Sequence, residues 1–358
     1  MTKPQPVSGS HPDSQPRHFR KSLLAWYDLH RRDLPWRESR DPYRVWLSEI
    51  MLQQTRVAAV IAHYQEFLRR FPTVEKLAAA REASVLAAWS GLGYYRRARM
   101  LHAAAKVVVR EHDGNFPATE EGLRELPGVG RYTAAAIASN AFGKPTAVVD
   151  GNVERVLQRV SGERLAGEEL WAAANALLDG KRPGDFNQAM MELGAVVCTP
   201  RAPTCLTCPV IGMCATRGEL AAGAKAAPQK KREIHYALDL REGDVFLVQR
   251  ARDTSLMPGM WELPELAGAE ELAGRQQILP ARFTRRRNVK VLGRGWGLGP
   301  LFTLRHSITV TDYRVRVWRN PAPPGVEGKW VPRERLERTA LTGLARKILR
   351  RAEIIGRD

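Results

Sequence analysis

The sequence lacks several features that would place the protein in other classes. No apolar run approaches the length of a membrane-spanning helix, and the N-terminus has no apolar stretch like that of a signal peptide. We therefore expect a cytoplasmic protein with no membrane partner. Only 4 of the 358 residues are cysteines, and they lie together near the middle of the chain. None is left over for disulfides, which a cytoplasmic protein would rarely form.

Acidic residues are also scarce. The chain has 38 Asp and Glu against 56 Lys and Arg, a formal net charge of +18. A phosphate backbone is the commonest polyanion that rewards such an excess, through the release of its counterions. An acidic membrane surface is the alternative, but no basic amphipathic helix with a bulky apolar face stands out. The net charge alone favours DNA or RNA as the partner and does not distinguish between them.

The patterning predicts two domains, which the length allows. Residues 1–16 are polar and rich in proline, and we expect a disordered tail. Apolar residues then recur at helical spacing between short breakers, which predicts an all-α domain over 17–216. Residues 217–232 are small, polar and lysine-rich, as in a linker. Alternating apolar and polar residues, with a helical pattern at 340–352, predict a small α+β domain over 233–358.

The cysteines form one compact loop over 198–214 with the spacing C-x6-C-x2-C-x5-C. Four thiolates in a short loop suit an iron–sulfur cubane or a structural zinc. Zinc sites usually pair two C-x2-C knuckles, and only one such pair exists here, so we favour a [4Fe–4S] cluster and keep zinc as the alternative. The spacing matches the cluster loop of the endonuclease III superfamily of DNA repair glycosylases. The expected ligands are Cys198, Cys205, Cys208 and Cys214.

A glycine-rich turn, LPGVG at 126–130, precedes a helical run. Gly128 and Gly130 there let backbone N–H groups converge on an anion at the start of the helix. Together with VDGNV, which contains Asp150, this turn resembles the helix-hairpin-helix and Gly/Pro–Asp motif of the same superfamily. The resemblance implies that the hairpin binds DNA phosphates and that Asp150 lies beside the target sugar. An N-cap for the following helix explains Asp150 equally well.

One position separates the subclasses of that superfamily. Where the endonuclease III subfamily has a nucleophilic lysine, two places after the second glycine of the hairpin, this chain has Tyr132. Without an amine there, the chain has no matching Schiff-base nucleophile. We therefore expect a monofunctional glycosylase that does not cut the DNA strand itself.

A lone acid, Glu49, lies inside the apolar helical stretch 42–55. A glutamate is most often on a helix surface, but here its neighbours are apolar, and burial would raise its pKa towards use as a general acid. The segment WLSEIMLQQT closely resembles the MutY family of adenine glycosylases. The segments PW, GLGYY, LPGVG, VDGN and MELG and the cysteines also match that family in order through nearly the whole first domain.

The resemblance implies a role for each residue of the site. Glu49 would be protonated and would donate its proton to the adenine ring, which must first be rotated out of the base stack. Asp150 would be ionised and would stabilise the positive charge on the deoxyribose, as a carboxylate does in retaining glycosidases. Tyr132 would place a hydroxyl near the same charge, and Asn152 would orient Asp150.

Further residues lie where the family lines the adenine pocket or enters the DNA at the mispair. For Trp36 and Arg37, core packing and a surface ion pair are the alternative explanations. For Tyr94, the alternatives are a phosphate contact or packing. Arginines at positions 96, 97 and 99, just after Tyr94, would suit contacts to the DNA backbone. The residues are Trp36, Arg37, Glu192, Gln54, Thr55 and Tyr94.

The second domain, at 245–250 and 257–264, resembles a Nudix fold. The glutamates that hold magnesium in Nudix hydrolases are absent, so we expect no pyrophosphatase activity. In the MutY family this domain reads 8-oxoguanine opposite the adenine, and a Phe-Ser-His turn takes part. Here the counterpart is Leu304-Arg305-His306, without the serine hydroxyl, so the sequence leaves the preference for 8-oxoguanine over guanine open. A histidine at a strand edge is the alternative interpretation of His306.

The sequence thus predicts an all-α catalytic domain with a helix-hairpin-helix and a [4Fe–4S] loop, followed by an α+β Nudix-like domain. We expect a monomeric adenine DNA glycosylase of base-excision repair, acting on double-stranded DNA with adenine opposite 8-oxoguanine or guanine. A thymine or uracil mismatch glycosylase of the same fold is one alternative. A non-catalytic DNA-binding protein with a cluster is another, but it would have no reason to keep Glu49, Tyr132 and Asp150 together.

Overall fold

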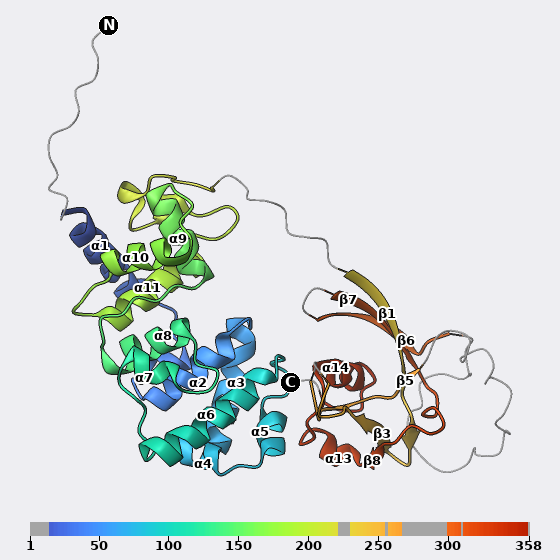
Figure 1. The fold of residues 1–358 in the computed structure, drawn as a ribbon. Helices are drawn as coiled ribbons and strands as arrows, with labels where there is room; N and C mark the ends of the chain where they lie inside the picture. Colours follow the sequence, from blue (N-terminus) through green and yellow to red (C-terminus); the bar gives the residue numbers. More distant parts are fainter. Residues whose placement is uncertain (1–13, 221–229, 255–256, 267–298, 309–310, 357–358) are drawn as a thin grey trace, which may run out of the picture. The chain divides into compact units, whose positions relative to one another are not determined.

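The computed structural model describes residues 14–220, 230–254, 257–266, 299–308 and 311–356 (Figure 1). The chain divides into two compact units. Unit 1 comprises Met1–Ala80 and Arg97–Lys225, and unit 2 comprises Arg81–Arg96 and Ala226–Asp358. Most of the expected tail and of the expected linker falls outside the described residues. Residues 14–16, at the end of that tail, form the first turn of a helix, and residues 230–232, at the end of that linker, begin a strand.

Unit 1 is helical, as the periodicity predicts. Its helices are separated at the breaker segments, because proline and glycine interrupt the backbone hydrogen bonds of a helix. The helices are α1 (Ser14–His30), η1 (Pro35–Arg37), α2 (Pro42–Leu52), α3 (Val57–Arg70), α4 (Val74–Ala78), α6 (Arg96–His112), α7 (Glu120–Arg124), α8 (Arg131–Phe142), α9 (Gly151–Ser161), α10 (Gly167–Leu177), α11 (Pro183–Val196), η2 (Cys205–Thr207) and η3 (Ile211–Met213).

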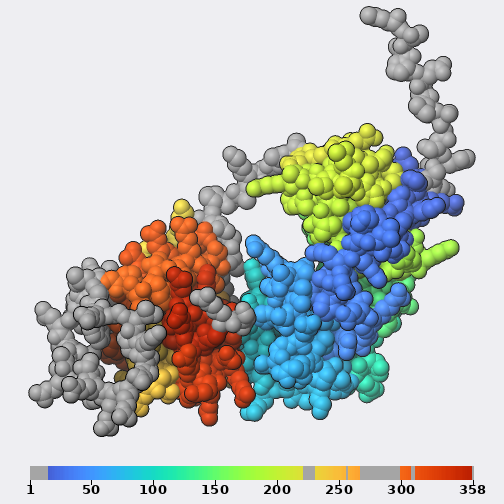
Figure 2. Space-filling model, turned by 180° about the vertical axis from the view of Figure 1, so that it is seen from behind, coloured from blue at the N-terminus to red at the C-terminus, as the bar shows by residue number. Residues whose placement is uncertain are grey.

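The first helix packs against helices from the far end of this unit. Phe19 and Tyr27 of α1 lie in one core cluster with Phe186 and Met190 of α11, and the rings of Phe19 and Phe186 are 6.4 Å apart. In Figure 2 the dark-blue residues of α1 accordingly lie beside yellow-green ones from α10 and α11. This long-range packing brings the segment before α2, which carries Trp36 and Arg37, to the side of α11.

Helices α7 and α8 form the expected hairpin. Gly128, in the turn between them, has φ of +76°, a conformation that favours glycine. A Cβ at this position would also lie 2.5 Å from the Cβ of Met100 on α6. Gly130 is the N-cap of α8 and has no side chain to cap the helix, so the first amides of α8 keep their capacity to bind an anion.

Unit 2 is α+β, as the alternating pattern predicts. One sheet has the strand order β5-β1-β7-β6, with β1 and β7 parallel, and the other has the order β2-β3-β4 with β8 beside β3. Buried side chains from both sheets and from α14 form its core. The elements are α5 (Glu82–Ala88), β1 (Lys230–Ala237), β2 (Leu240–Arg241), β3 (Asp244–Gln249), β4 (Trp261–Glu262), β5 (Glu265–Leu266), β6 (Phe302–Ile308), β7 (Thr311–Trp318), β8 (Lys329–Val331), α13 (Arg333–Leu336) and α14 (Gly343–Arg351).

The segment Arg81–Arg96 belongs to unit 2, although the composition gave no reason to separate it from the helices around it. The Tyr95 hydroxyl donates a 2.7 Å hydrogen bond to the carbonyl of Leu341, and Arg346 donates one of 2.7 Å to the Ser90 hydroxyl. Contacts between residues some 250 positions apart leave no trace in local sequence patterns. Across the described residues of both units, no helix is both long and apolar enough to cross a membrane.

Candidate active site

Glu49 lies on α2 and is buried, with 4% of its surface exposed. The helix begins with Asp41, whose side chain accepts a 2.8 Å hydrogen bond from the backbone N–H of Arg44, and with Pro42, whose missing N–H costs nothing there. The hydroxyl of Tyr132, on α8, donates a 2.9 Å hydrogen bond to Oε2 of Glu49. The structure thus buries this carboxyl, as its position within an apolar helical stretch indicates.

Burial changes the acidity of both partners. Desolvation raises the pKa of Glu49 to about 7; the Tyr132 hydrogen bond lowers it, the nearby charge of Asp150 raises it and Arg37 lowers it. Burial also raises the pKa of Tyr132 well above 10, assisted by the charges of Glu49 and Asp150. At neutral pH, therefore, Tyr132 keeps its proton and a large fraction of Glu49 is protonated and able to act as an acid.

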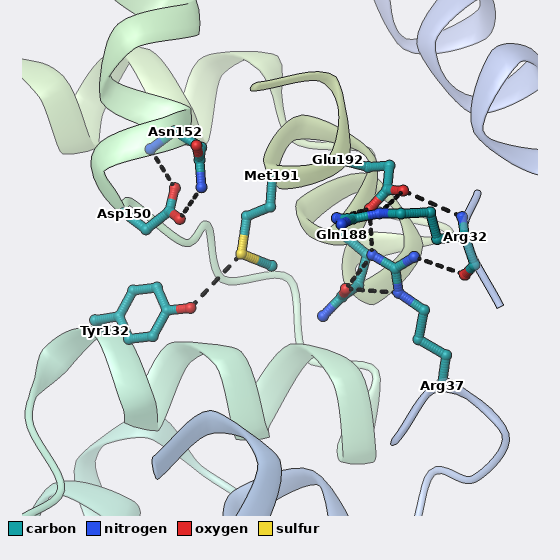
Figure 3. Close-up of polar contacts among 8 residues, drawn as sticks. All are labelled: Arg32, Arg37, Tyr132, Asp150, Asn152, Gln188, Met191 and Glu192. Atoms are coloured by element: carbon teal, nitrogen blue, oxygen red, sulfur yellow. Dashed lines mark hydrogen bonds and ion pairs between the residues drawn. The ribbon is translucent and has the colours of Figure 1, made fainter. Parts of the chain in front are cut away.

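Asp150 is the N-cap of α9. Its Oδ1 accepts hydrogen bonds from the backbone N–H groups of Asn152 and Val153, at 2.9 and 2.7 Å, and its Oδ2 accepts a 2.8 Å bond from the Asn152 side chain (Figure 3). These donors fix the orientation of a negatively charged carboxylate at the positive end of a helix. The capping interpretation of Asp150 is thus correct, and it leaves the carboxylate near enough to Glu49 to act on its pKa.

Arg155, one turn further along α9, holds Asn152 from the other side. Its guanidinium donates to Oδ1 of Asn152 at 2.9 Å, to the carbonyl of Gly194 at 2.7 Å and to the carbonyl of Cys198 at 2.7 Å. Hydrogen bonds therefore run from Asp150 through Asn152 and Arg155 to the start of the cysteine loop. A Cβ on Gly194 would lie 2.6 Å from the Cβ of Asn152, so α9 and α11 approach this closely only with glycine there.

A cavity of about 120 Å³ opens beside Glu49. Trp36 and Arg37 from η1 and Gln188 from α11 contribute to its lining together with Glu49. Trp36 is buried and packs edge-on against Tyr64, with the ring centroids 5.6 Å apart. Trp36 and Arg37, which the resemblance places in the adenine pocket, thus line the same cavity as Glu49.

Glu192 is fully buried, and its carboxylate is paired with two arginines. Arg32 donates to it with its backbone N–H and with two guanidinium nitrogens, the shortest bond being 2.7 Å, and Arg37 adds one bond of 2.8 Å (Figure 3). Burial would raise the pKa of Glu192, but the bonds from Arg32 and Arg37 outweigh it and bring the pKa to about 2. Arg37 also donates two 3.2 Å bonds to the Gln188 side-chain oxygen. Glu192 therefore holds the two arginines in place.

Other expected site residues lie in exposed or partly exposed positions. Gln54 follows α2, is exposed and has φ of +55°, while the Thr55 hydroxyl accepts a 3.0 Å bond from Arg97. Tyr94, in unit 2, has 47% of its surface exposed and φ of +48°. His306 lies in strand β6, and burial together with Lys347 lowers its pKa. The alternative interpretation of His306, a strand histidine, fits its position.

The four cysteines form no disulfide bonds and are half-buried. The Arg159 guanidinium donates to Sγ of Cys198 at 3.3 Å, and the backbone N–H of Arg217 donates to Sγ of Cys214 at 3.4 Å. Burial raises the pKa of Cys208, and the three other thiols, close enough to interact with it, raise it further. Among the described residues, no group of three or more His, Cys, Asp or Glu side chains is arranged to hold a metal ion.

Sequence reasoning missed four residues of this site: Arg32, Arg155, Gln188 and Met191. Tyr132 also contacts Sδ of Met191 at 3.6 Å, and Figure 3 shows Met191 on α11 between Tyr132 and the Glu192 cluster. Arg32 and Arg155 make their contacts across 160 and 43 positions of the chain, so no local pattern predicts them. The spacing of Gln188 and Glu192, one helical turn apart, was the one available signal.

Comparisons with known proteins agree with this geometry. Residues 47–171 match the family described as HhH-GPD superfamily base excision DNA repair protein. The adenine DNA glycosylase of Mus musculus is 36% identical over 411 residues, which cover 94% of this chain and 78% of that protein. The Homo sapiens enzyme is 52% identical over 214 residues, which cover 56% of this chain and 39% of that protein.

Among solved structures, a thermostable thymine-DNA glycosylase matches with a TM-score of 0.55 at 32% identity, covering 57% of this chain and 97% of its own. The chain thus spans less than half of the human relative but most of the mouse one. The chain belongs to the adenine DNA glycosylase (MutY) family, within the HhH-GPD superfamily of base-excision DNA repair proteins.

Proposed function

We propose that this protein is a monofunctional adenine DNA glycosylase that removes adenine paired with 8-oxoguanine or guanine in double-stranded DNA. The observation that carries the proposal is the pair of unlike carboxyl groups in one site. Glu49 is buried with a pKa of about 7, whereas Asp150 accepts three hydrogen bonds from N–H donors. A glycosidic bond is cleaved by such a pair, one group acting as acid and the other as a negative charge.

In this mechanism the adenine leaves the stack and enters the cavity beside Trp36, Arg37 and Glu49. Protonated Glu49 donates its proton to the purine ring, which makes the base a better leaving group, and a positioned acid contributes roughly 10²–10⁴-fold. The Gln188 oxygen already accepts bonds from Arg37, so its amide nitrogen is the group left to donate to the base.

Asp150 stabilises the positive charge that develops on the deoxyribose. Its fixed orientation means that little reorganisation is needed as the charge forms. After the base leaves, Glu49 has given up its proton and serves as the base for the attacking water. Tyr132 donates to Glu49 throughout, because its own pKa is far above neutral. With a tyrosine at this position instead of a lysine, no Schiff base forms there and the strand stays intact.

We further propose that the first amides of α8, beyond Gly130, bind a DNA phosphate, and that Gln54, Thr55 and Tyr94 contact the bases at the mispair. We assign to the C-terminal unit a Nudix-like fold in which the segment of His306 meets the base opposite the adenine. The net charge of +18 suits binding to DNA, and we expect the protein to act as a monomer.

The four cysteines suit a [4Fe–4S] cluster. Their thiols interact with one another, and N–H donors from Arg159 and Arg217 point at two of the sulfurs, as suits thiolates that carry negative charge. When bound, the cluster supplies a covalent clip that orders the loop and does no chemistry on the substrate. Arg155 ties the start of this loop to Asn152, so an ordered loop supports the position of Asp150.

The test is incubation of the purified holoprotein with three duplexes, holding A opposite 8-oxoguanine, A opposite T, and T opposite G. We expect breaks at the adenine of the first duplex only, after alkali, and their loss in Glu49→Gln. Cleavage of the thymine duplex would support the thymine mismatch activity that the 32% identical structure bears in its name. Cleavage of none would leave a DNA-binding protein, and breaks without alkali would reveal a lyase.

A further inference from the structure

The end of helix α2 is held by one arginine from α6. Nη1 of Arg97 donates to the carbonyl oxygens of Ile50 and Met51, at 2.9 Å each, and of Gln53, at 2.5 Å. Its Nη2 donates to the Thr55 hydroxyl at 3.0 Å. The last carbonyls of a helix have no partner within the helix, and a cation there also meets the negative end of the helix dipole. Arg97 therefore completes the C-terminus of α2.

Gln54, which lies between the residues that Arg97 binds, has an unfavourable backbone conformation. Gln54, flanked by Gln53 and Thr55, has φ of +55°, a left-handed conformation that costs energy for any residue with a side chain. Such a conformation persists only where its surroundings impose it. Arg97 binds the residue on each side of Gln54, so it supplies that constraint and leaves the Gln54 side chain exposed.

The same segment is tied to the catalytic helix pair. The side-chain amide of Gln53 donates a 3.2 Å bond to the Thr133 hydroxyl, next to Tyr132 on α8. Glu49 lies on α2, immediately before Ile50, whose carbonyl Arg97 binds. The arginine thus fixes a short segment that begins beside the acid and ends with the exposed glutamine. Nη1 and Nη2 of Arg97 thus donate within this segment, to three backbone carbonyls and to the Thr55 hydroxyl, rather than to a DNA phosphate.

We infer that Arg97 is a positioning residue for base extrusion: it holds Gln54 in its left-handed conformation, so that this side chain can fill the space that the adenine vacates. The inference rests on the proposed function for its catalytic part. Its structural part, that Arg97 maintains the Gln54 turn, does not need DNA. The two parts are therefore tested separately.

The structural test compares two replacements of Gln54 in two backgrounds. With Arg97 present, Gln54→Gly should melt at a higher temperature than Gln54→Ala, because glycine alone tolerates a positive φ without strain. With Arg97→Met, or with Arg97→Lys if the methionine variant does not fold, that difference should disappear because the turn relaxes. An equal difference in both backgrounds would overturn the inference, whatever reaction the protein catalyses.

The functional test uses Arg97→Met and, as the control, Arg110→Met, which removes the same charge from an exposed position on the same helix. With 2-aminopurine in place of the target adenine, the fluorescence rise on extrusion should be lost in Arg97→Met alone. Single-turnover excision should fall about 10- to 100-fold in that variant. The pH dependence of the rate and the affinity for undamaged duplex should not change. A loss of affinity for every duplex, with a smaller salt dependence, would instead make Arg97 a phosphate contact.

If the parent protein excises no adenine, the proposed function fails, while the melting comparison still decides whether Arg97 holds the turn. If the parent protein excises adenine and Arg97→Met extrudes 2-aminopurine normally, the positioning role is refuted while the proposed function stands.

Discussion

The buried acid makes the stability of the protein depend on pH in a way that one substitution reveals. Glu49 has a pKa of about 7 in the folded protein, against 4.5 for an unperturbed glutamate. Glu49→Gln keeps the shape of the side chain and an oxygen that can accept the Tyr132 hydrogen bond, but it cannot ionise. The difference in stability between the two proteins therefore isolates the cost of burying this one charge.

The sign of this pH dependence follows from the pH at which the folded and the unfolded chain each lose the proton of Glu49. Below pH 4.5 the carboxyl is neutral in the folded and in the unfolded chain, so the two proteins differ little. As the pH rises from 4.5 to about 7, the unfolded chain loses the proton before the folded one does, and the parent protein loses stability. From about pH 8, one unit above the folded-state pKa, both states are almost fully ionised and the loss is constant. A shift of two and a half pKa units, at 1.36 kcal/mol per unit, makes that loss roughly 3 kcal/mol.

The assay is thermal melting of both holoproteins at a series of pH values from 4.5 to 8.5. Other titrating groups are common to both proteins, so they cancel in the difference between the two melting temperatures. Glu49→Gln should gain on the order of 5–10 °C relative to the parent as the pH rises, with a plateau from about pH 8. A difference that does not vary with pH would refute the reasoning, because Glu49 would then ionise as an exposed glutamate does.

Three further substitutions probe the surroundings of the two carboxyl groups. Tyr132→Phe removes a hydrogen bond that lowers the pKa of Glu49, so the alkaline limb of the rate profile should move to higher pH, with about a tenfold lower rate at its maximum. A limb that stays in place would show that the hydroxyl does not act on the acid. Arg155→Met should lower single-turnover excision about 10- to 100-fold while leaving that limb unchanged, since it loosens Asn152 and not Glu49; unchanged excision would contradict the link from Arg155 to the site. Gly194→Ala should destabilise the protein by about 1–3 kcal/mol in chemical denaturation, because the new methyl group meets Asn152, and a neutral effect would mean that the helices separate at no cost.

Much of the site could be predicted because its chemistry is local. An acid among apolar residues on one helix indicates burial, and an aspartate before a helical run indicates an N-cap; the structure confirms both for Glu49 and Asp150. A glycine-rich turn before a helix likewise indicates the positive φ found at Gly128. In each of these cases the physical cause lies within a few residues of its effect.

The remaining features depend on contacts that only the folded chain makes. The sequence placed Glu192 in the lining of the adenine pocket, but it did not show that this carboxylate accepts four N–H hydrogen bonds from Arg32 and Arg37. Arg97 was expected at the DNA backbone and instead completes a helix over 40 positions away. A charged side chain gives no sign in the sequence of whether it binds solvent, phosphate or backbone, because the partner is set by tertiary packing.

The different surroundings of Glu49 and Asp150 explain how one site can hold a protonated carboxyl group beside an ionised one. Glu49 is buried and receives one hydrogen bond, from a hydroxyl that does not ionise near neutral pH. Asp150 lies at a helix N-terminus with three N–H donors. Burial favours the protonated form of Glu49, and the charge of Asp150 in turn helps to keep the proton on Glu49. Capping and catalysis therefore require the same ionised carboxylate, so Asp150→Asn should weaken α9 only modestly, since asparagine also caps, yet should abolish excision and lower the pKa of Glu49. Retained excision in a folded Asp150→Asn protein would show that the negative charge is dispensable, and the mechanism would then have to rest on the acid alone.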